Sequence, residues 1–331
     1  MTTFCCSASR PLLLRRTVLA AASVLAIGLQ ATAAQASTSI LFIGNSFTYG
    51  ALASVQTFRT STVTDLNGTG IGGVPALFKA FTQEAGLDYA VSLETQPGSN
   101  LDFHYINRLA LIDKAWDKVV MHGQSNLDFG APNNPAKISQ YTGVLGGVFQ
   151  ARNANVDISL TATWARADLT YQTASPWLGK PISAMAYDVQ AGYDVAAANN
   201  PAIVKRVNPV GLAWNRAIEQ GIADGNPYDG ISPGMLNLWA PENYHASNYG
   251  YYLHALTVFG MVTGVDPRSL GGNENAAVEL GFNAAATVAL QRIAFEQISA
   301  VPEPGAWALL AGGLGLLGWA GRRRQQANAR V

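Results

Sequence analysis

The chain has 331 residues, of which 49% are hydrophobic and 13% charged, and its 21 basic and 21 acidic side chains balance. Seven basic residues but only one acidic residue lie within 1–36 and 301–331, so residues 37–300 carry a net charge of −6, which argues against nucleic acid and anionic lipid as partners. Both cysteines, Cys5 and Cys6, lie in the first segment, which excludes disulfides, cysteine metal sites and thiol catalysis from residues 37–300.

Residues 1–36 have the pattern of a secretory signal peptide. Three arginines precede an apolar run over residues 17–29, and Ala34 and Ala36 provide the small residues of a cleavage site. The pattern predicts export by the general secretory route and a mature chain that begins near Ser37. Residues 37–300 are enough for one large domain with a sizeable core.

The first element of that domain is predicted at residues 40–43, where four apolar residues indicate a buried strand. Gly44 and Asn45 then allow a sharp turn, and Ser46 stands where the chain leaves a strand and begins a helix. The carboxyl ends of parallel strands are where open α/β sheets bind ligands, so Ser46 is a candidate nucleophile. The alternative is that Asn45 and Ser46 form an ordinary helix cap.

The rest of the domain alternates between strand and helix patterns. Residues 51–73, rich in Thr, Ser and Gly, are predicted to form a long loop at the rim of the sheet. Four further strands are predicted at 89–93, 118–121, 156–163 and 202–207, and helices at 75–85, 101–115, 183–198, 210–221, 248–261 and 275–298. This alternation predicts an α/β fold, a three-layer αβα sandwich with a central parallel sheet.

Residues 301–331 combine three parts in order. Pro302-Glu303-Pro304 is followed by an uncharged Gly- and Leu-rich run at 305–321 and then by arginines at 322–324. A helix over that run would span about 25 Å, slightly less than the roughly 30 Å of a bilayer core, with the arginines on the cytoplasmic side. The order of parts resembles the PEP-CTERM sorting signal of Gram-negative bacteria. That resemblance implies processing by an exosortase, usually in organisms that make exopolysaccharide; a plain tail anchor is the alternative.

Four blocks of the domain resemble the signature blocks of SGNH (GDSL-like) hydrolases. They are GNSFT at 44–48, Gly98, the loop HGQSN at 122–126, and ENYHASNYGYYL at 242–253. The resemblance implies a flavodoxin-like three-layer fold and a serine esterase without metal or organic cofactor. The block at 122–126 is also similar to that of carbohydrate acetylesterases in the same superfamily.

The resemblance assigns roles to a nucleophile, a base and an acid. A serine hydroxyl needs a base to take its proton, and a histidine with an acid to orient it meets that need. Carried over, Ser46 is the nucleophile, His245 the base and Glu242 the orienting acid. The family usually has Asp where Glu242 stands, so Asp229 is kept as the reserve acid.

The negative oxygen of a tetrahedral intermediate needs fixed hydrogen-bond donors. The resemblance implies the backbone N–H groups of Ser46 and Gly98 as two of them. The family's third donor is an asparagine in Gly-x-Asn, where this chain has Gly-Gln-Ser-Asn. Gln124 and Asn126 therefore compete for the third place, and His122 stays open as well.

The remaining histidines and the large aromatic residues are expected to have mainly structural roles. His254 and His104 are expected to be structural or surface residues, and four histidines without cysteine make a zinc site improbable. Large aromatic residues are more often core than sugar-stacking surfaces, which applies to Trp164, Trp177, Trp239 and Tyr244. Arg166, after the fourth strand, is a candidate to reach the site.

The expected function is that of a secreted serine esterase that removes O-acetyl groups from extracellular polysaccharide through an acyl-serine intermediate. The chain is expected to cross the inner membrane of a Gram-negative bacterium, to be anchored transiently by its tail, and to reach the cell surface or medium. Two alternatives stay open: a lipase or thioesterase with an acyl pocket lined by residues 51–73, and a non-catalytic carbohydrate-binding protein on the same fold.

Overall fold

The structure is a computed structural model that describes residues 1–4 and 37–300. The expected signal peptide at 1–36 therefore falls almost wholly outside the described residues. The expected sorting segment at 301–331, with its transmembrane helix at 305–321, falls wholly outside them. In the part of the chain that is described, no helix is both long and apolar enough to span a bilayer.

Residues 37–300 are built on a parallel sheet of six strands in the order β2-β3-β1-β4-β5-β6. The strands are β1 (Thr38–Gly44), β2 (Thr64–Asp65), β3 (Tyr89–Thr95), β4 (Lys118–Met121), β5 (Asp157–Ala162) and β6 (Val204–Pro209). After β1 the chain forms β2 and β3 on one side of β1, and it then crosses over to form β4 on the other side of β1. The carboxyl end of β1 is thus a topological switch point, where sheets of this kind bind ligands.

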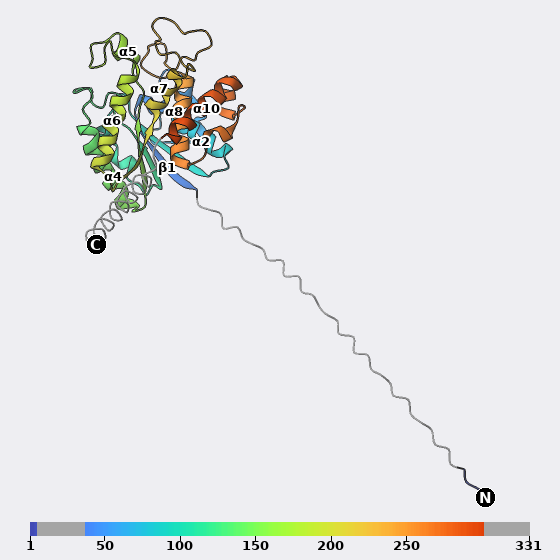
Figure 1. Ribbon diagram of the computed structural model, residues 1–331. Helices are drawn as coiled ribbons and strands as arrows, with labels where there is room; N and C mark the ends of the chain where they lie inside the picture. Colours follow the sequence, from blue (N-terminus) through green and yellow to red (C-terminus); the bar gives the residue numbers. More distant parts are fainter. Residues whose placement is uncertain (5–36, 301–331) are drawn as a thin grey trace, which may run out of the picture. The chain divides into compact units, whose positions relative to one another are not determined.

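Helices cover both faces of the sheet, as Figure 1 shows. One group contains α2 (Gly73–Glu84), α7 (Val210–Glu219), α8 (Asn248–Thr263) and α10 (Ala284–Ser299), and the other α3 (Leu101–Ile112), α4 (Ala136–Arg152) and α6 (Ser183–Asn199). The short elements are α1 (Ser46–Tyr49), α5 (Ala167–Tyr171), α9 (Asn275–Glu279), η1 (Ser54–Thr57), η2 (Thr60–Thr62) and η3 (Pro267–Leu270). The three-layer αβα fold expected from the sequence is confirmed.

The core strand β1 forms for the reason that its sequence indicates. Its four apolar residues, Ile40, Leu41, Phe42 and Ile43, are all at most 2% exposed. Because β1 pairs with β3 on one side and β4 on the other, both of its faces are covered, and a continuous apolar run suits such a strand.

The structure corrects two of the predicted elements and adds a long helix that was not predicted. The expected loop at 51–73 contains η1, η2 and the edge strand β2, and the helix expected at 275–298 is divided into α9 and α10, with Gly281 at φ 78° between them. Helix α4 was not expected, because glycines interrupt its apolar pattern. One of them is required by packing: a Cβ on Gly146 would lie 2.2 Å from Ile203 Cγ2.

Candidate active site

The turn between β1 and α1 places Ser46 at the rim of the sheet. Asn45 caps α1, with its Oδ1 accepting the Phe47 N–H at 3.1 Å, so that Ser46 is the first helical residue. Gly44 is required by close packing, since a Cβ there would lie 2.4 Å from His122 Nε2. Ser46 is 5% exposed, and its Oγ makes no hydrogen bond to any described residue.

Asn45 also fastens three strand-end loops together. Its Nδ2 donates to the carbonyl oxygen of Ser99, after β3, at 3.0 Å and to that of Gly123, after β4, at 2.9 Å. The side chain is 4% exposed. One buried amide therefore sets the relative positions of the segments that follow β1, β3 and β4.

The loop before α8 presents the histidine–acid pair. His245 Nδ1 donates to Glu242 Oε1 at 2.6 Å, and the same oxygen accepts the backbone N–H of His245 at 2.8 Å. Between them Asn243 adopts φ 61°, a left-handed conformation that asparagine tolerates better than most residues. The loop is closed by the Ala240 N–H, which donates to the His245 carbonyl at 2.8 Å.

This pairing fixes the tautomer of His245. Because the carboxylate accepts the proton on Nδ1, Nε2 keeps a free lone pair, which is the form a general base needs. Burial lowers the pKa of His245 below its ordinary value of 6.5, and the hydrogen bond that His245 donates to Glu242 partly offsets this. Nε2 is buried and has no hydrogen-bond partner among the described residues.

Aromatic packing brings the His245 loop to the helix that carries Ser46. The imidazole meets the ring of Phe47, the residue after Ser46, with 5.7 Å between ring centroids. Trp164 stacks on Phe47, with 4.0 Å between ring centroids, and donates its indole N–H to the Tyr244 carbonyl at 3.2 Å. His245 and Ser46 thus lie in one cluster without a hydrogen bond between them. Such bonds are often long in unliganded enzymes and shorten when substrate is bound.

The expected oxyanion donors lie around the same rim. Gly98 has φ 67° in a turn after β3, and neither its N–H nor that of Ser46 donates to an acceptor in residues 37–300. Gln124 Oε1 accepts the Phe129 N–H at 2.8 Å and its Nε2 donates to the Gly98 carbonyl at 2.9 Å. The amide is therefore oriented with its NH₂ towards the Gly98 turn. Asn126 is 5% exposed, and its buried Oδ1 has no partner among the described residues.

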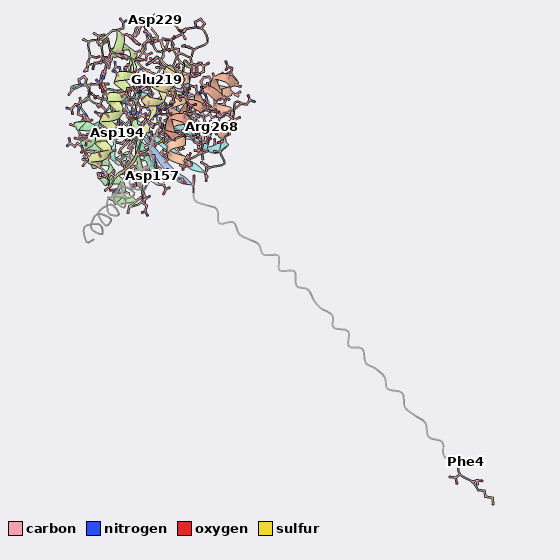
Figure 2. The ribbon with its side chains drawn as sticks, viewed as in Figure 1. Phe4, Asp157, Asp194, Glu219, Asp229 and Arg268 are labelled. Atoms are coloured by element: carbon pink, nitrogen blue, oxygen red, sulfur yellow. The ribbon has the colours of Figure 1, made fainter. Side chains whose placement is uncertain are left out.

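The reserve candidates lie elsewhere or are already occupied. His122 is buried, with its Nδ1 donating to the Gly123 carbonyl at 2.9 Å and its Nε2 2.6 Å from Thr48 Oγ1, so both ring nitrogens are used within the fold. Asp229 is exposed and accepts from Asn226 Nδ2 at 2.7 Å; Figure 2 shows it at the opposite end of residues 37–300 from Asp157, the first residue of β5. Glu242, not Asp229, is therefore the acid beside His245.

The aromatic residues divide between core and site. Trp164, Trp177 and Trp239 are at most 1% exposed and belong to the core. Tyr244 is half-buried and stacks on His245, with 4.2 Å between ring centroids. The Arg166 guanidinium carbon lies over the Tyr244 ring, 3.7 Å from its centroid, and Arg166 is paired with Asp168. The positive charge of Arg166 also contributes to the lowered pKa of His245.

An open cleft of about 540 Å³ adjoins the turn that carries Gly98. Tyr49 reaches it from α1, three positions after Ser46 and so on the same side of that helical turn. The other walls come from the segment at 51–73 and from β3 and α3. They include the polar side chains of Gln56, Asn67, Thr69, Thr95, Gln96 and Arg108 and the apolar ones of Leu66, Ile71, Pro97 and Leu111.

One buried pair near this rim was not expected from the sequence. His104, expected as a helix or surface residue, is 0% exposed and bonded to Glu94, which is also 0% exposed. Glu94 directly follows the strand expected at 89–93, and the structure extends that strand to Thr95 with Glu94 buried, where an acidic side chain requires a partner.

Replacing each of the two candidate acids by its amide distinguishes their roles. Glu242→Gln is expected to lower kcat for a short ester by about 10²- to 10⁴-fold, because the imidazolium loses its charged partner.

The pH profile of kcat/KM tests the same pair. In the wild type, kcat/KM is expected to fall on the acidic side at a pH below 6.5, since the pKa of His245 is lowered. This fall should move to still lower pH in the variant, because the carboxylate that raises this pKa is gone. Asp229→Asn should change kcat less than about twofold; a larger loss than in Glu242→Gln would contradict the assignment.

Two buried histidines are expected to make the fold sensitive to acid. Burial lowers the pKa of His122 to about 4 and that of His254 to about 3, from 6.5. Between these values the unfolded chain binds the proton and the folded chain does not, so stability is complete above about pH 6.5 and is lost as the pH falls. The loss between about pH 7.5 and pH 5 should be about 2 kcal/mol per histidine.

Thermal unfolding across this pH range measures the effect. His254→Gln removes one titrating group, so the slope of Tm against pH should decrease whatever the variant does to Tm at neutral pH. An unchanged slope would contradict the prediction.

Comparison with known proteins gives one family-model match and a set of similar folds. Residues 300–324 match the PEP-CTERM protein-sorting motif, which is a signal for export and sorting in Gram-negative bacteria and agrees with the resemblance noted at 301–331. No curated protein matches the chain.

Among solved structures, a DUF4886 family protein from Bacteroides uniformis is similar with a TM-score of 0.54 and 18% identity, over 81% of this chain and 98% of that one. A GDSL-like lipase candidate from Parabacteroides merdae has a TM-score of 0.47 and 16% identity, over 69% and 96% of the two chains. A two-domain esterase active on acetylated mannans has a TM-score of 0.42 and 12% identity, over 69% and 49%. The first likeness agrees with the three-layer αβα fold.

Proposed function

We propose that residues 37–300 form a serine ester hydrolase in which Ser46 is the nucleophile, His245 the general base and Glu242 the acid that orients it. The observation that carries the proposal is the state of His245. Its Nδ1 is held by Glu242 at 2.6 Å, while its buried Nε2 has no partner in the described residues and its ring packs against the residue after Ser46. A base with one nitrogen fixed and the other free is ready to accept a hydroxyl proton.

The reaction follows from these positions. Ser46 Oγ attacks the ester carbonyl carbon as its proton passes to His245 Nε2, and the carbonyl oxygen becomes negative. The N–H groups of Ser46 and Gly98 stabilise that oxygen; removal of one such donor typically costs about 10²- to 10³-fold in kcat. The intermediate collapses as Nε2 returns the proton to the leaving alcohol, and water then attacks the acyl-serine by the same route.

For the third donor we favour Gln124 over Asn126. The orientation of the Gln124 amide is set from both ends, by the Phe129 N–H on its oxygen and by the Gly98 carbonyl on its nitrogen. Its second N–H is therefore available on the side of the Gly98 turn. Asn126 is more deeply buried than Gln124, and His122 has both nitrogens engaged.

The proposed substrate is a short acyl ester of an extracellular carbohydrate, with the O-acetyl group of an exopolysaccharide as the best fit. The 540 Å³ cleft beside the Gly98 turn is open and has six polar side chains, one of them Arg108, together with four apolar ones, whereas a long acyl chain requires an enclosing apolar pocket. The sorting signal is usual in bacteria that make such polymers. We further propose that residues 1–36 are removed on export, that residues 301–331 are processed by an exosortase-type enzyme after transient anchoring, and that the domain acts at the cell surface or in the medium.

Chain-length preference tests this proposal. The purified protein should hydrolyse 4-nitrophenyl acetate with a kcat/KM at least roughly tenfold above that for the dodecanoate, because an open cleft with six polar side chains in its walls does not enclose a long apolar chain. It should also release acetate from acetylated polysaccharide. A preference for the dodecanoate would support a lipase instead, and absence of turnover on every ester would support a non-catalytic binding protein.

A further inference from the structure

We propose that Glu94, His104 and Ser99 form a buried positioning relay that holds the Gly98 peptide in place as an oxyanion donor. The inference rests on the proposed function, because it assigns these residues to the same reaction. They do not touch the substrate in this proposal. They act through the backbone of residues 96–100, the segment between β3 and α3.

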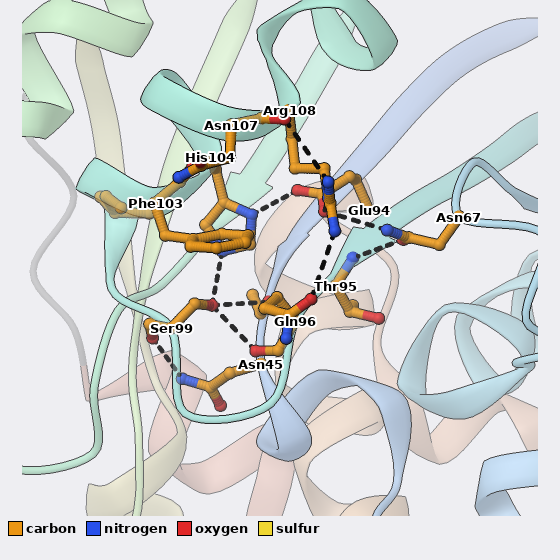
Figure 3. A network of polar contacts seen from close by, with 12 residues as sticks. Asn45, Asn67, Glu94, Thr95, Gln96, Ser99, Phe103, His104, Asn107 and Arg108 are labelled. Atoms are coloured by element: carbon orange, nitrogen blue, oxygen red, sulfur yellow. Dashed lines mark hydrogen bonds and ion pairs between the residues drawn. The ribbon is translucent and has the colours of Figure 1, made fainter.

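The relay is a continuous line of polar contacts, which Figure 3 shows with His104 between the other two residues. Ser99 Oγ and His104 Nε2 lie 2.8 Å apart, and His104 Nδ1 donates to Glu94 Oε2. The other carboxylate oxygen of Glu94 accepts from Asn67 Nδ2 at 3.2 Å. The side chains of Glu94 and His104 are 0% exposed, so each needs its partner to be buried at low cost.

The relay ends on the turn that contains Gly98. Ser99 Oγ donates to the Gln96 carbonyl at 2.9 Å, which joins the two ends of the turn across Gly98. The Ser99 carbonyl is held by Asn45 Nδ2 at 3.0 Å, and the Gly98 carbonyl is held by Gln124 Nε2 at 2.9 Å. The turn around Gly98 is therefore held at three carbonyl groups, those of Gln96, Gly98 and Ser99, and the relay supplies the contact to the first of them.

The turn needs such support because of its own sequence. Gly98 has φ 67°, and a Cβ placed there would meet no atom within 4 Å, so side-chain packing does not hold the residue. A glycine in open space has more conformational freedom than any other residue. An oxyanion donor displaced by about 1 Å can lower the rate by about 10²-fold, so the orientation of this one peptide is decisive for the reaction.

The same geometry raises a second interpretation, in which Ser99 is itself a nucleophile. The sequence of contacts serine, histidine and acid is the one expected at an active site. Two observations oppose that reading: the Ser99 hydroxyl already donates to the Gln96 carbonyl, and the whole side chain of His104 is enclosed. His245, by contrast, keeps 14% of its side chain exposed, and its Nε2 has no hydrogen-bond partner among the described residues.

The test compares Ser99→Ala with Ser159→Ala, which removes a hydroxyl from another buried serine, on β5 and far from the turn along the chain. With 4-nitrophenyl acetate, Ser99→Ala should lower kcat by about 10- to 100-fold and leave KM within about twofold, because only the transition state uses the oxyanion donors. Ser99→Thr, which keeps the hydroxyl, should recover most of the rate. Ser159→Ala should leave kcat within about twofold, and an equal kcat loss in both alanine variants would overturn the relay.

A second measurement separates the relay from the proposed function. In the ¹⁵N NMR spectrum, the Gly98 amide should shift and broaden in Ser99→Ala and in Glu94→Gln but keep its position in Ser159→Ala. This result is expected even if the wild type has no esterase activity, in which case the proposed function fails and the relay stands as a structural device of the turn. An unchanged Gly98 amide overturns the relay. Labelling by a fluorophosphonate should occur on Ser46; labelling on Ser99 overturns it as well.

Discussion

Ser46→Ala should abolish esterase activity, lowering kcat for 4-nitrophenyl acetate by about 10⁴-fold or more. The variant loses the attacking oxygen, whereas His245, Glu242 and the backbone donors remain. Because Ser46 Oγ makes no hydrogen bond to the described residues, its removal should leave Tm within about 2 °C of the wild type. Steady-state kinetics and thermal unfolding measure the two quantities.

The control is Ser269→Ala, at a serine on η3 whose hydroxyl donates to the Asp266 carbonyl at 2.7 Å on the surface. It should retain full activity. If Ser46→Ala keeps more than about a tenth of the wild-type rate, serine catalysis at this position is refuted. Adding His245→Ala to Ser46→Ala should cause little further loss, since the two residues act as a unit.

Trp164→Ala should cause the largest loss of stability. The indole is 0% exposed and lies parallel to the rings of Phe47 and Trp214, with centroid distances of 4.0 and 4.8 Å. Truncating a buried tryptophan to alanine typically costs about 4 kcal/mol, which corresponds to a fall in Tm on the order of 10 °C in a domain of this size. Chemical denaturation and thermal unfolding would measure both.

Trp177→Ala is the matched control, because Trp177 is equally buried and its indole N–H donates to Asp188 rather than to the site. Both variants should lose similar stability. Only Trp164→Ala should also lower kcat, by roughly tenfold at a temperature where both are folded, because Trp164 contacts Phe47, the residue after Ser46, and the carbonyl of Tyr244, the residue before His245. Equal kcat values in the two variants would show that Trp164 serves the core alone.

Local features of the site were accessible from the amino-acid sequence. The apolar run of β1 ending in Gly44-Asn45-Ser46 predicts a strand and a turn, because both depend on neighbouring residues. The pairing of Glu242 with His245 is similarly local, since three positions separate them and one loop sets their geometry. The net charge, the lack of cysteine after residue 36 and the sorting motif also follow from composition and order alone.

Other features depended on which segments the fold brings together. Helix α4 was not predicted because its glycines weaken the periodic pattern. At position 146 a glycine is required by close contact with Ile203 on another segment, and the sequence pattern of the helix does not reveal such a contact. Whether His104 lies on the surface or beneath the Gly98 turn depends on how α3 packs beside β3, and only that packing pairs it with Glu94 and Ser99.

The sequence determined the types of reacting group and the strand ends at which they stand, because backbone conformation and hydrophobic patterning act over a few residues. The tertiary structure decided which of them meet. In the fold, the His245 ring packs against Phe47, which stacks on Trp164, and this places His245 beside the helix that begins at Ser46. The His122 ring packs against Gly44. The physical reason is that side-chain packing over long separations in the chain depends on the complete fold, which no local pattern encodes.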